Sequence, residues 1–350
     1  MFKIQKGKIM KNGIRVIDCE HHFSLELMVQ EWKKTMTPEQ WKAMQGDIKF
    51  DNPTGATKKM MDIVMDIDAL RLDVMDKAGI DFAQISLTTP GAEYFEPEIG
   101  KKIAALYNDT LMAAIKKHPD RFGAYMALCP EDVEWSLKEI DRCVKGGMFG
   151  WATLSNFNGK YLDDSKYLPI LEKLASYKMP VYLHPNFCTW KEYDEFGYCL
   201  NGPSLGFTAD TQLAYMRLIH RGVFDKLPDL KVIMGHDCEA MGFFKDRMNT
   251  AWRQGAGQPA ANIGVTLEHE PSYYLDKNTW GTTSGNYSQI ALKATIDSMG
   301  VEKLMLGTDF LYEDVKEMVD FIGDNKDMTP EEKKAILSGN AEKLGFGVIA

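Results

Sequence analysis

Acidic and histidine side chains close several short apolar runs of this sequence. Glu20 and His22 end the stretch "IRVIDCEHHF", and because they are two residues apart on an extended segment their side chains point the same way. The runs "VYLHP", "VIMGHDCE" and "LMLGTDF" carry His184, His236 and Asp309 in the same way. Imidazole nitrogens and carboxylate oxygens are ligands that suit Zn, Mn, Fe or Co, and a catalytic site leaves one position open. The pattern predicts a divalent metal site, provided that the fold brings these residues together.

Each of these residues also has an ordinary structural explanation. A histidine after a strand often only makes a hydrogen bond, and an aspartate there often caps the next helix. Five separate explanations of that kind would be needed, so one metal site accounts for the pattern better. His21 should point to the other side of its strand and is not expected to be a ligand. His118, His220 and His269 lie at predicted helix ends or in a loop, and we expect them to be structural or solvated.

The elements that must position these residues alternate along the chain. Short apolar runs at 14–18, 80–87, 122–128, 147–154, 180–184, 230–236, 278–283 and 302–309 are typical of strands. Between them lie stretches with helical periodicity, several of which stop at Gly or just before Pro. Eight strand-and-helix units are the count of a (β/α)8 TIM barrel, in which all strand ends meet at one mouth. A doubly wound open sheet is the alternative.

The chain is longer than the roughly 250 residues of a simple barrel, so we expect insertions within one domain spanning residues 1–350. Residues 24–58 follow the first strand and residues 186–207 follow the fifth, so both should line the active-site face. Five aromatic residues lie near the predicted mouth in sequence and could form an apolar slot there, although ordinary packing explains any one of them: Phe23, Phe187, Trp190, Tyr193 and Phe310.

Composition narrows the function classes. The formal net charge is −9 and there is no long basic run, which argues against a nucleic-acid partner. No stretch approaches the roughly 18 apolar residues of a membrane helix, and the N-terminus lacks the apolar core of a secretory signal. Six cysteines are scattered without a CxxC pair, which favours a cytoplasmic location. The sequence has no GxGxxG or Walker motif to hold an organic cofactor.

Several motifs, taken in order, carry a family resemblance over nearly the whole chain. They are "CEHHF", "RLDVMDKAGIDFAQISLTTPG", "VYLHP", "RLIHRGVFDKLPDLKVIMGHDCEA", "TTSGNYS" and "LGTDF". Together they resemble the amidohydrolase superfamily, in particular its branch of metal-dependent, non-oxidative aromatic-acid decarboxylases. Known members act on γ-resorcylate, 2,3-dihydroxybenzoate and 5-carboxyvanillate. The resemblance therefore implies release of CO2 from a hydroxybenzoate-type acid to give a phenol.

The resemblance also assigns roles to residues. It implies one divalent ion, Zn²⁺ or Mn²⁺, held by Glu20, His22, His184 and Asp309. His236 would lie near the metal and the substrate with Glu239 orienting its imidazole, and Asp309 would donate the proton that the pair relays. Arg247 matches an arginine that in the family can reach the active site of a neighbouring subunit, which implies a homodimer or homotetramer. Arg71 is a weaker candidate for a second substrate contact.

Departures from the family pattern leave rivals open. The family usually has an acid where His21 stands, Met-Gly where Asp237 and Cys238 stand, and a Tyr-Pro-rich sequence where "FLYED" follows Asp309. The same ligands could activate water in a single-metal hydrolase of a lactone, amide or ester. The stretch "WATLSNFNG" offers no bridging lysine for a second metal. A non-enzymatic barrel that keeps the metal only for folding is the third possibility.

Overall fold

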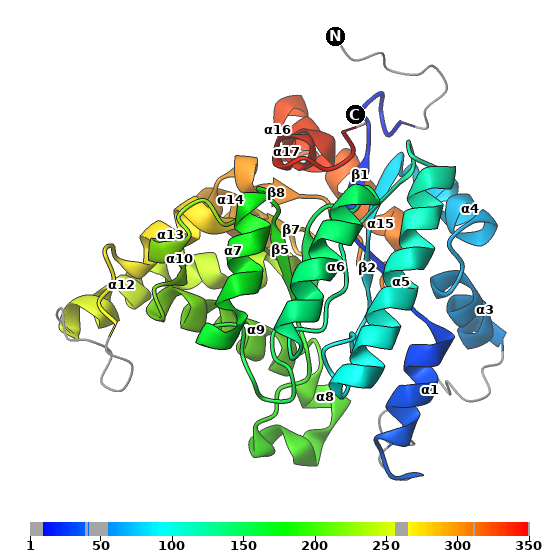
Figure 1. The fold of residues 1–350 in the computed structure, drawn as a ribbon. Helices are drawn as coiled ribbons and strands as arrows, with labels where there is room; N and C mark the ends of the chain where they lie inside the picture. The colour runs from blue at the N-terminus through cyan, green and yellow to red at the C-terminus, as the bar shows by residue number, and fades with distance from the viewer. Residues whose placement is uncertain (1–9, 39–40, 42–54, 256–264, 311, 349–350) are drawn as a thin grey trace.

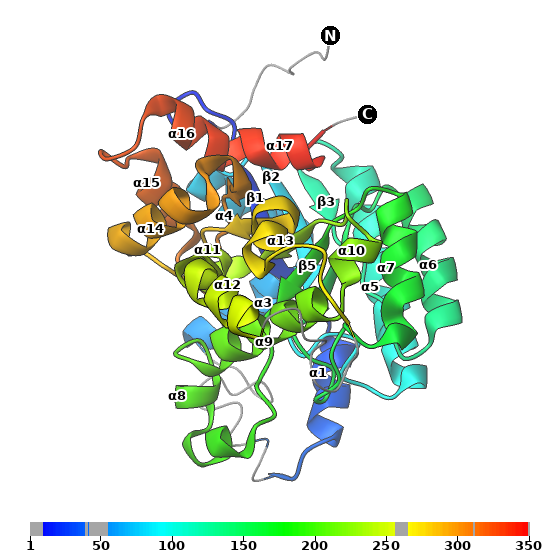
Figure 2. The ribbon, with the colours of Figure 1, turned by 90° about the vertical axis from the view of Figure 1, so that its left-hand side faces the viewer.

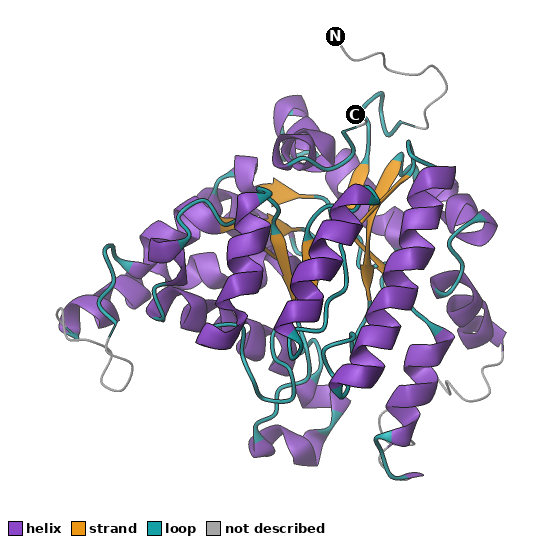
Figure 3. Ribbon diagram, viewed as in Figure 1, coloured by secondary structure: helices purple, strands orange, loops and turns teal. Residues whose placement is uncertain are grey.

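The structure is a computed structural model that describes residues 10–38, 41, 55–255, 265–310 and 312–348. In this part of the chain eight parallel strands alternate with helices, and each lies in or overlaps one of the eight predicted runs. The strands lie at the centre, with helices outside them (Figure 3). The strands are β1 (Ile17–Phe23), β2 (Phe82–Leu87), β3 (Phe122–Ala124), β4 (Trp151–Leu154), β5 (Val181–His184), β6 (Val232–Met234), β7 (Thr279–Thr282) and β8 (Leu304–Met305).

Backbone pairing joins these strands into a ring. Continuous ladders form two sheets, with the orders β1-β2-β3 and β4-β5-β6-β7-β8. Met126 pairs with Trp151 across one gap, and His21 pairs with Phe310 across the other. At the second gap His22 N also donates to Phe310 O at 2.9 Å. Strand order therefore follows chain order around the ring, which confirms the predicted (β/α)8 barrel over the doubly wound alternative.

Helices surround the strands (Figure 1). They are α1 (Glu26–Lys34), α3 (Gly55–Val64), α4 (Ala69–Ala78), α5 (Pro97–Lys117), α6 (Val133–Lys145), α7 (Leu168–Ser176), α8 (Tyr198–Asn201), α9 (Gly206–His220), α10 (Val223–Lys226), α11 (Gly235–Glu239), α12 (Lys245–Gln254), α13 (Pro271–Asn278), α14 (Gln289–Met299), α15 (Val315–Gly323), α16 (Pro330–Lys334) and α17 (Asn340–Leu344). Shorter 3-10 or π turns are η1 (Ser165–Tyr167), η2 (Lys191–Phe196), η3 (Met241–Phe244), η4 (Val301–Lys303) and η5 (Ala335–Gly339). Among the described residues no helix is both long and apolar enough to span a bilayer.

The first strand corrects the sequence-based boundary. The prediction ended the first apolar run at Asp18, whereas β1 continues to Phe23, because its polar residues pair with β2: His22 lies opposite Ser86. Between Asp18 and His21 the register slips by one residue, which is a β-bulge. Ile17 and Cys19 pack in the cluster inside the barrel, together with residues of other strands such as Tyr182. The bulge resets the alternation after Cys19, so that Glu20 and His22 also face inward, at the mouth.

The two predicted insertions leave the barrel at the same end. Figures 1 and 2 both place α1 and α8 at the end of the molecule opposite α16 and α17. Of residues 24–58, the stretch 42–54 and residues 39–40 lie outside the described part of the chain. In 186–207, Phe187 packs against Tyr198 and Phe207, with ring centroids 6.1 and 5.3 Å away. That these segments line an active-site face stays a prediction.

Candidate metal and proton-transfer site

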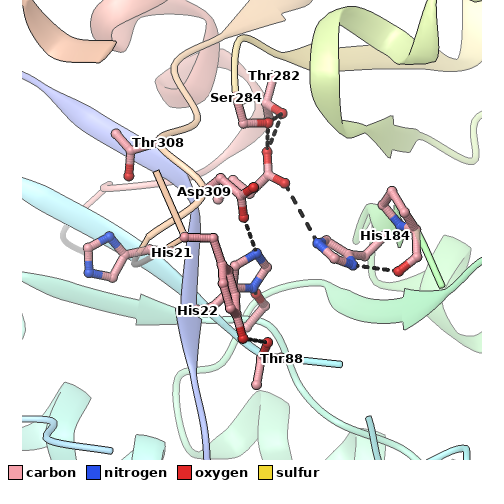
Figure 4. Close-up of polar contacts among 12 residues, drawn as sticks. His21, His22, Thr88, His184, Thr282, Ser284, Thr308 and Asp309 are labelled. Atoms are coloured by element: carbon pink, nitrogen blue, oxygen red, sulfur yellow. Dashed lines mark hydrogen bonds and ion pairs between the residues drawn. The ribbon is translucent and has the colours of Figure 1, made fainter. Parts of the chain in front are cut away.

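Four of the predicted residues meet at the carboxyl ends of the strands. Glu20 and His22 come from β1, His184 ends β5, and Asp309 follows β8 (Figure 4). One potential ligand atom from each lies within 4.8 Å of the others. Glu20 and His22 are buried, whereas His184 and Asp309 are partly exposed toward the mouth. The group could therefore hold one cation with its open side toward solvent or substrate.

The two histidines of this group present the same nitrogen. Nδ1 of His22 is 2.9 Å from the hydroxyl of Ser86, and Nδ1 of His184 is 2.8 Å from the carbonyl oxygen of Pro185. These partners leave Nε2 of each ring for the metal, as hydrogen bonds from the outer nitrogen do in metal sites generally. Burial, helped by the neighbouring His22, lowers the pKa of His184 to about 4, so its imidazole is neutral at pH 7. A neutral imidazole is the form that binds a metal.

Glu20 supplies the test of whether a metal fits. Its Oε2 accepts hydrogen bonds from Thr282 and Ser284, whereas its Oε1 is buried without a hydrogen-bond partner. A buried carboxylate oxygen left unpaired is costly, and a bound cation removes that cost. Nε2 of His184 and of His236 lie 3.9 and 3.6 Å from this oxygen. The residues present therefore fit a divalent cation.

His236 lies beside the metal group on an unusual turn. From His236 to Ala240 all five residues have φ between 48° and 56°, the left-handed region, although none is glycine. This turn folds Glu239 back so that its Oε1 is 2.7 Å from Nδ1 of His236. Thr208 donates to the other oxygen of Glu239 at 2.6 Å. Left-handed L-residues cost roughly 1–2 kcal/mol each, and such strain is characteristic of functional sites.

The electrostatics of His236 and Asp309 are coupled. Burial lowers the pKa of His236, but the charges of Glu239 and Glu20 raise it more, so the net pKa lies well above its usual value. Burial would raise the pKa of Asp309, but the adjacent imidazoles of His22 and His236 hold it well below its usual range. Nε2 of His236 is 3.8 Å from Asp309 Oδ2, and Nε2 of His22 is 3.1 Å from Asp309 Oδ1. Without a metal, the arrangement pairs an ionised aspartate with a protonated histidine.

Comparison with known proteins decides the family. The sequence model of the amidohydrolase family matches residues 17–344, which is almost the whole chain. This chain belongs to the amidohydrolase family. The predicted resemblance to the decarboxylase branch is confirmed as well, because the relatives are decarboxylases.

Two curated relatives and two solved structures illustrate the match. The amidohydrolase is 29% identical to the γ-resorcylate decarboxylase of Polaromonas sp., over 80% of this chain and 88% of the relative. It is 29% identical to the decarboxylase orsB of Emericella nidulans, over 78% and 84%. The 5-carboxyvanillate decarboxylase of Novosphingobium aromaticivorans, solved with manganese and 3-methoxy-4-hydroxy-5-nitrobenzoic acid, superposes with a TM-score of 0.87 at 28% identity, over 95% and 97%. The 2,6-dihydroxybenzoate decarboxylase of Rhizobium gives a TM-score of 0.82 at 25% identity, over 95% and 98%.

The two arginines of the sequence prediction lie elsewhere in the amidohydrolase. Arg71 is fully buried, and its three nitrogens donate to the carbonyl oxygens of Asp66, His22 and Val64. Its guanidinium also packs 4.5 Å from the ring centroid of Phe310. With these donors bonded to backbone carbonyls, Arg71 helps to hold the end of β1, and its substrate contact stays a prediction.

Arg247 lies on α12 and lines a cavity of about 460 Å³ between α12 and the end of α9. The cavity is mainly apolar, with Met216, Met248 and Trp252 among its lining residues. This cavity is on the outside of the barrel, and the metal group of the same chain is formed without Arg247. The contact of Arg247 with the substrate of a neighbouring subunit stays a prediction.

The predicted aromatic slot is only partly supported by position. Phe23 and Phe310 are buried, and Phe310 stacks on His21 with ring centroids 3.9 Å apart. His21 in turn pairs with Asp18 at 2.7 Å, in agreement with the expectation that it is not a ligand. Tyr312, which was not predicted, has its ring 5.9 Å from that of His22 and its hydroxyl 2.8 Å from that of Thr88. Tyr312 thus adds an aromatic ring beside His22 that the sequence analysis did not name as part of a slot.

Proposed function

We propose that this amidohydrolase is a carboxy-lyase that removes CO2 from a hydroxybenzoate-type acid without oxidation and releases a phenol. The observation that carries the proposal is the Glu20–His22–His184–Asp309 group, open on the side where His236 and Asp309 approach each other. The named decarboxylases that it resembles support the substrate class. A cytoplasmic location, expected from the free cysteines, goes with this proposal.

We assign Glu20, His22, His184 and Asp309 as ligands of a single divalent ion. Manganese is favoured because the 5-carboxyvanillate decarboxylase structure contains it, and zinc remains compatible with the ligand types. When bound, such an ion supplies Lewis-acid polarisation and a template for the carboxylate and ortho-hydroxyl of a substrate. No organic cofactor is required, because the leaving CO2 returns its bonding electron pair to the ring.

The proton that replaces CO2 must reach the ring carbon that carries the carboxylate. In the proposed path Asp309 delivers it, and because its pKa is held low it must first receive the proton from elsewhere. His236 lies close enough to provide it after substrate binding, and Glu239 stabilises the protonated imidazole. The ring becomes tetrahedral at that carbon, the C–C bond breaks, and aromaticity is restored.

We further propose that the enzyme is a homodimer or homotetramer in which Arg247 serves the site of a neighbouring subunit. Support comes from its place on α12, where an exposed guanidinium borders an apolar cavity outside the barrel. The adjacent Phe243 is 80% exposed, which is unusual for a large apolar side chain. A subunit packed here would cover both features.

Isotopes test the reaction type directly. Manganese-loaded enzyme is incubated with a panel of hydroxybenzoates, and with lactones, amides and esters of such acids, in D2O and separately in H2¹⁸O, followed by chromatography and mass spectrometry. Decarboxylation predicts a phenol with one new deuterium on the ring and no ¹⁸O, with CO2 in equal amount. A hydrolase acting on a lactone, amide or ester would incorporate ¹⁸O and release no CO2, and that outcome would replace our proposal.

Two variants belong in the same experiment. Asp309→Asn and His236→Ala should abolish turnover while the circular dichroism of the folded barrel persists, because each interrupts the proton path; a general acid contributes roughly 10²- to 10⁴-fold. His118→Gln, at the end of α5 where β3 is about to begin and away from the metal group, is the control and should keep wild-type turnover. Full activity in either site variant would refute the path.

A further inference from the structure

Two hydroxyl groups at the end of β7 hold the carboxylate of Glu20. Thr282 Oγ1 donates to Glu20 Oε2 at 2.6 Å, and Ser284 Oγ donates to the same oxygen (Figure 4). All three residues are buried, with 1% or less of their surface exposed. Neither hydroxyl reaches Oε1, the oxygen that faces the two imidazoles. The two oxygens of one carboxylate thus have separate surroundings.

The donor role of Ser284 follows from its partner. A carboxylate oxygen only accepts, so the hydroxyl proton of Ser284 is directed to Glu20, while Ser284 Oγ accepts from the backbone N–H of His236 at 3.2 Å. Thr282 Oγ1 lies 3.1 Å from Ser284 Oγ, and both hydroxyls have Glu20 Oε2 as acceptor. The same serine therefore links Glu20 to the start of the turn that carries His236. Thr282 and Ser284 are two residues apart at the end of β7, which places both side chains on the same side.

Two glycines complete the fit around Glu20. A Cβ added at Gly307 would lie 2.9 Å from Glu20 Oε2, and one added at Gly235 would lie 3.1 Å from Oε1. Their missing side chains allow the carboxylate to sit between the ends of β6 and β8. Rotation of the carboxylate would break both hydroxyl contacts and is restricted by this packing.

We propose that Thr282 and Ser284 are positioning residues that fix Glu20 as a one-oxygen metal ligand, with Oε1 presented to the cation and Oε2 reserved for the two hydroxyl donors. The inference rests on the proposed function only in requiring that a divalent ion binds at this group. Residues that orient a metal ligand in this way typically change metal affinity about 10- to 100-fold when removed.

Metal affinity measured without substrate tests this. Manganese binding to metal-stripped, folded enzyme is followed by competition with a chromophoric chelator for the wild type, Thr282→Val and Ser284→Ala. Each variant removes one donor with little change of volume, and we expect each to raise the Kd about 10- to 100-fold. Thr282→Ser keeps the hydroxyl and should restore affinity to within about threefold of the wild type. Because substrate is absent, the result is independent of which reaction the enzyme catalyses.

Another threonine of the same strand provides the matched control. Thr279, at the start of β7, is equally buried, but its hydroxyl contacts that of Tyr215 at 2.6 Å rather than Glu20. Thr279→Val should leave the Kd unchanged, and thermal unfolding of each metal-free variant checks that the barrel is intact. Ser284→Ala removes one atom and decides the question alone if Thr282→Val does not fold. Wild-type affinity in a folded Ser284→Ala or Thr282→Val enzyme, or an equal loss in Thr279→Val, would overturn the proposal.

Discussion

Each imidazole at this site has one ring nitrogen that is held by a neighbouring residue. Nδ1 of His22 is held by Ser86, that of His184 by the carbonyl of Pro185, and that of His236 by Glu239. Nε2 of His22 lies 3.1 Å from Asp309 Oδ1, and Nε2 of His184 and of His236 lie 3.9 and 3.6 Å from Glu20 Oε1. This pre-organisation means that ligand binding does not have to order the side chains, which favours both affinity and positioning.

The buried carboxyl of Glu93, outside the metal group, should make the stability of the enzyme depend on pH. Burial raises the pKa of its carboxyl to about 7, and the nearby Thr153 hydroxyl offsets this only partly. The folded enzyme therefore binds a proton at Glu93 that the unfolded chain releases above its ordinary pKa of 4.5, and stability falls as the pH rises from about 4.5 to 7. Glu93→Gln should stabilise the enzyme at pH 8, by at most about 3 kcal/mol, and have little effect near pH 4.5.

Urea unfolding at both pH values and constant salt measures this difference. Glu96→Gln changes an exposed acid three residues away and should have the same small effect at both. An effect of Glu93→Gln that does not depend on pH would contradict a buried, neutral carboxyl.

The residues that the sequence could identify are those whose type is rare at a strand end. Four ligands and His236 stood out because acids and imidazoles seldom follow apolar runs by chance. Ser284, Thr282 and Ser86 did not stand out, because hydroxyl residues are common at strand ends and only their contacts distinguish them. The burial of Arg71 was not predictable for a similar reason: its three carbonyl partners appear only in the fold.

At the scale of elements, periodicity located the strands but not their irregularities. The eight apolar runs correspond to β1 to β8, because buried parallel strands are apolar on both faces. The bulge in β1 was not predictable, since it depends on pairing with β2, yet it decides which side chains face inward. The left-handed turn after β6 was not predictable either, because "HDCEA" contains no glycine to mark a positive φ.

The backbone strain of the turn after β6 can be measured by replacing Ala240. Ala240 is exposed at its end with φ of 55°, so its Cβ contributes strain without packing. Ala240→Gly removes that strain and should stabilise the enzyme by about 0.5–1 kcal/mol, after allowing for the greater freedom of glycine in the unfolded chain. Ala113→Gly, at an exposed position inside the right-handed helix α5, should instead destabilise it by about 1 kcal/mol. The two shifts in chemical denaturation midpoint should have opposite signs, and the same sign would show that the turn relaxes in solution.

At the scale of the whole molecule, the barrel explains how residues as far apart in sequence as 20 and 309 form one group. Side chains from β1, β5 and the end of β8 converge because every strand ends at the same mouth. The outer surface near α12 leaves large apolar side chains exposed. The cavity between α9 and α12, with Arg247 at its edge and Phe243 exposed nearby, has the character of a surface that another subunit covers.

Subunit complementation tests whether Arg247 acts across that surface. Arg247→Ala and Asp309→Asn are each expected to be inactive, the first for lack of the substrate contact and the second for lack of the ligand and proton donor. In a mixed dimer the Arg247→Ala subunit keeps Asp309 and receives Arg247 from its partner, so one site in two is complete. Co-expressed in equal amounts, the two variants should recover about a quarter of wild-type activity, because half of the dimers are mixed. Activity is measured on tandem-purified mixed dimers as well as on the unsorted pool. If Arg247 acted within its own subunit, or not at all on the substrate, the mixture would show no more activity than the average of the two parent variants.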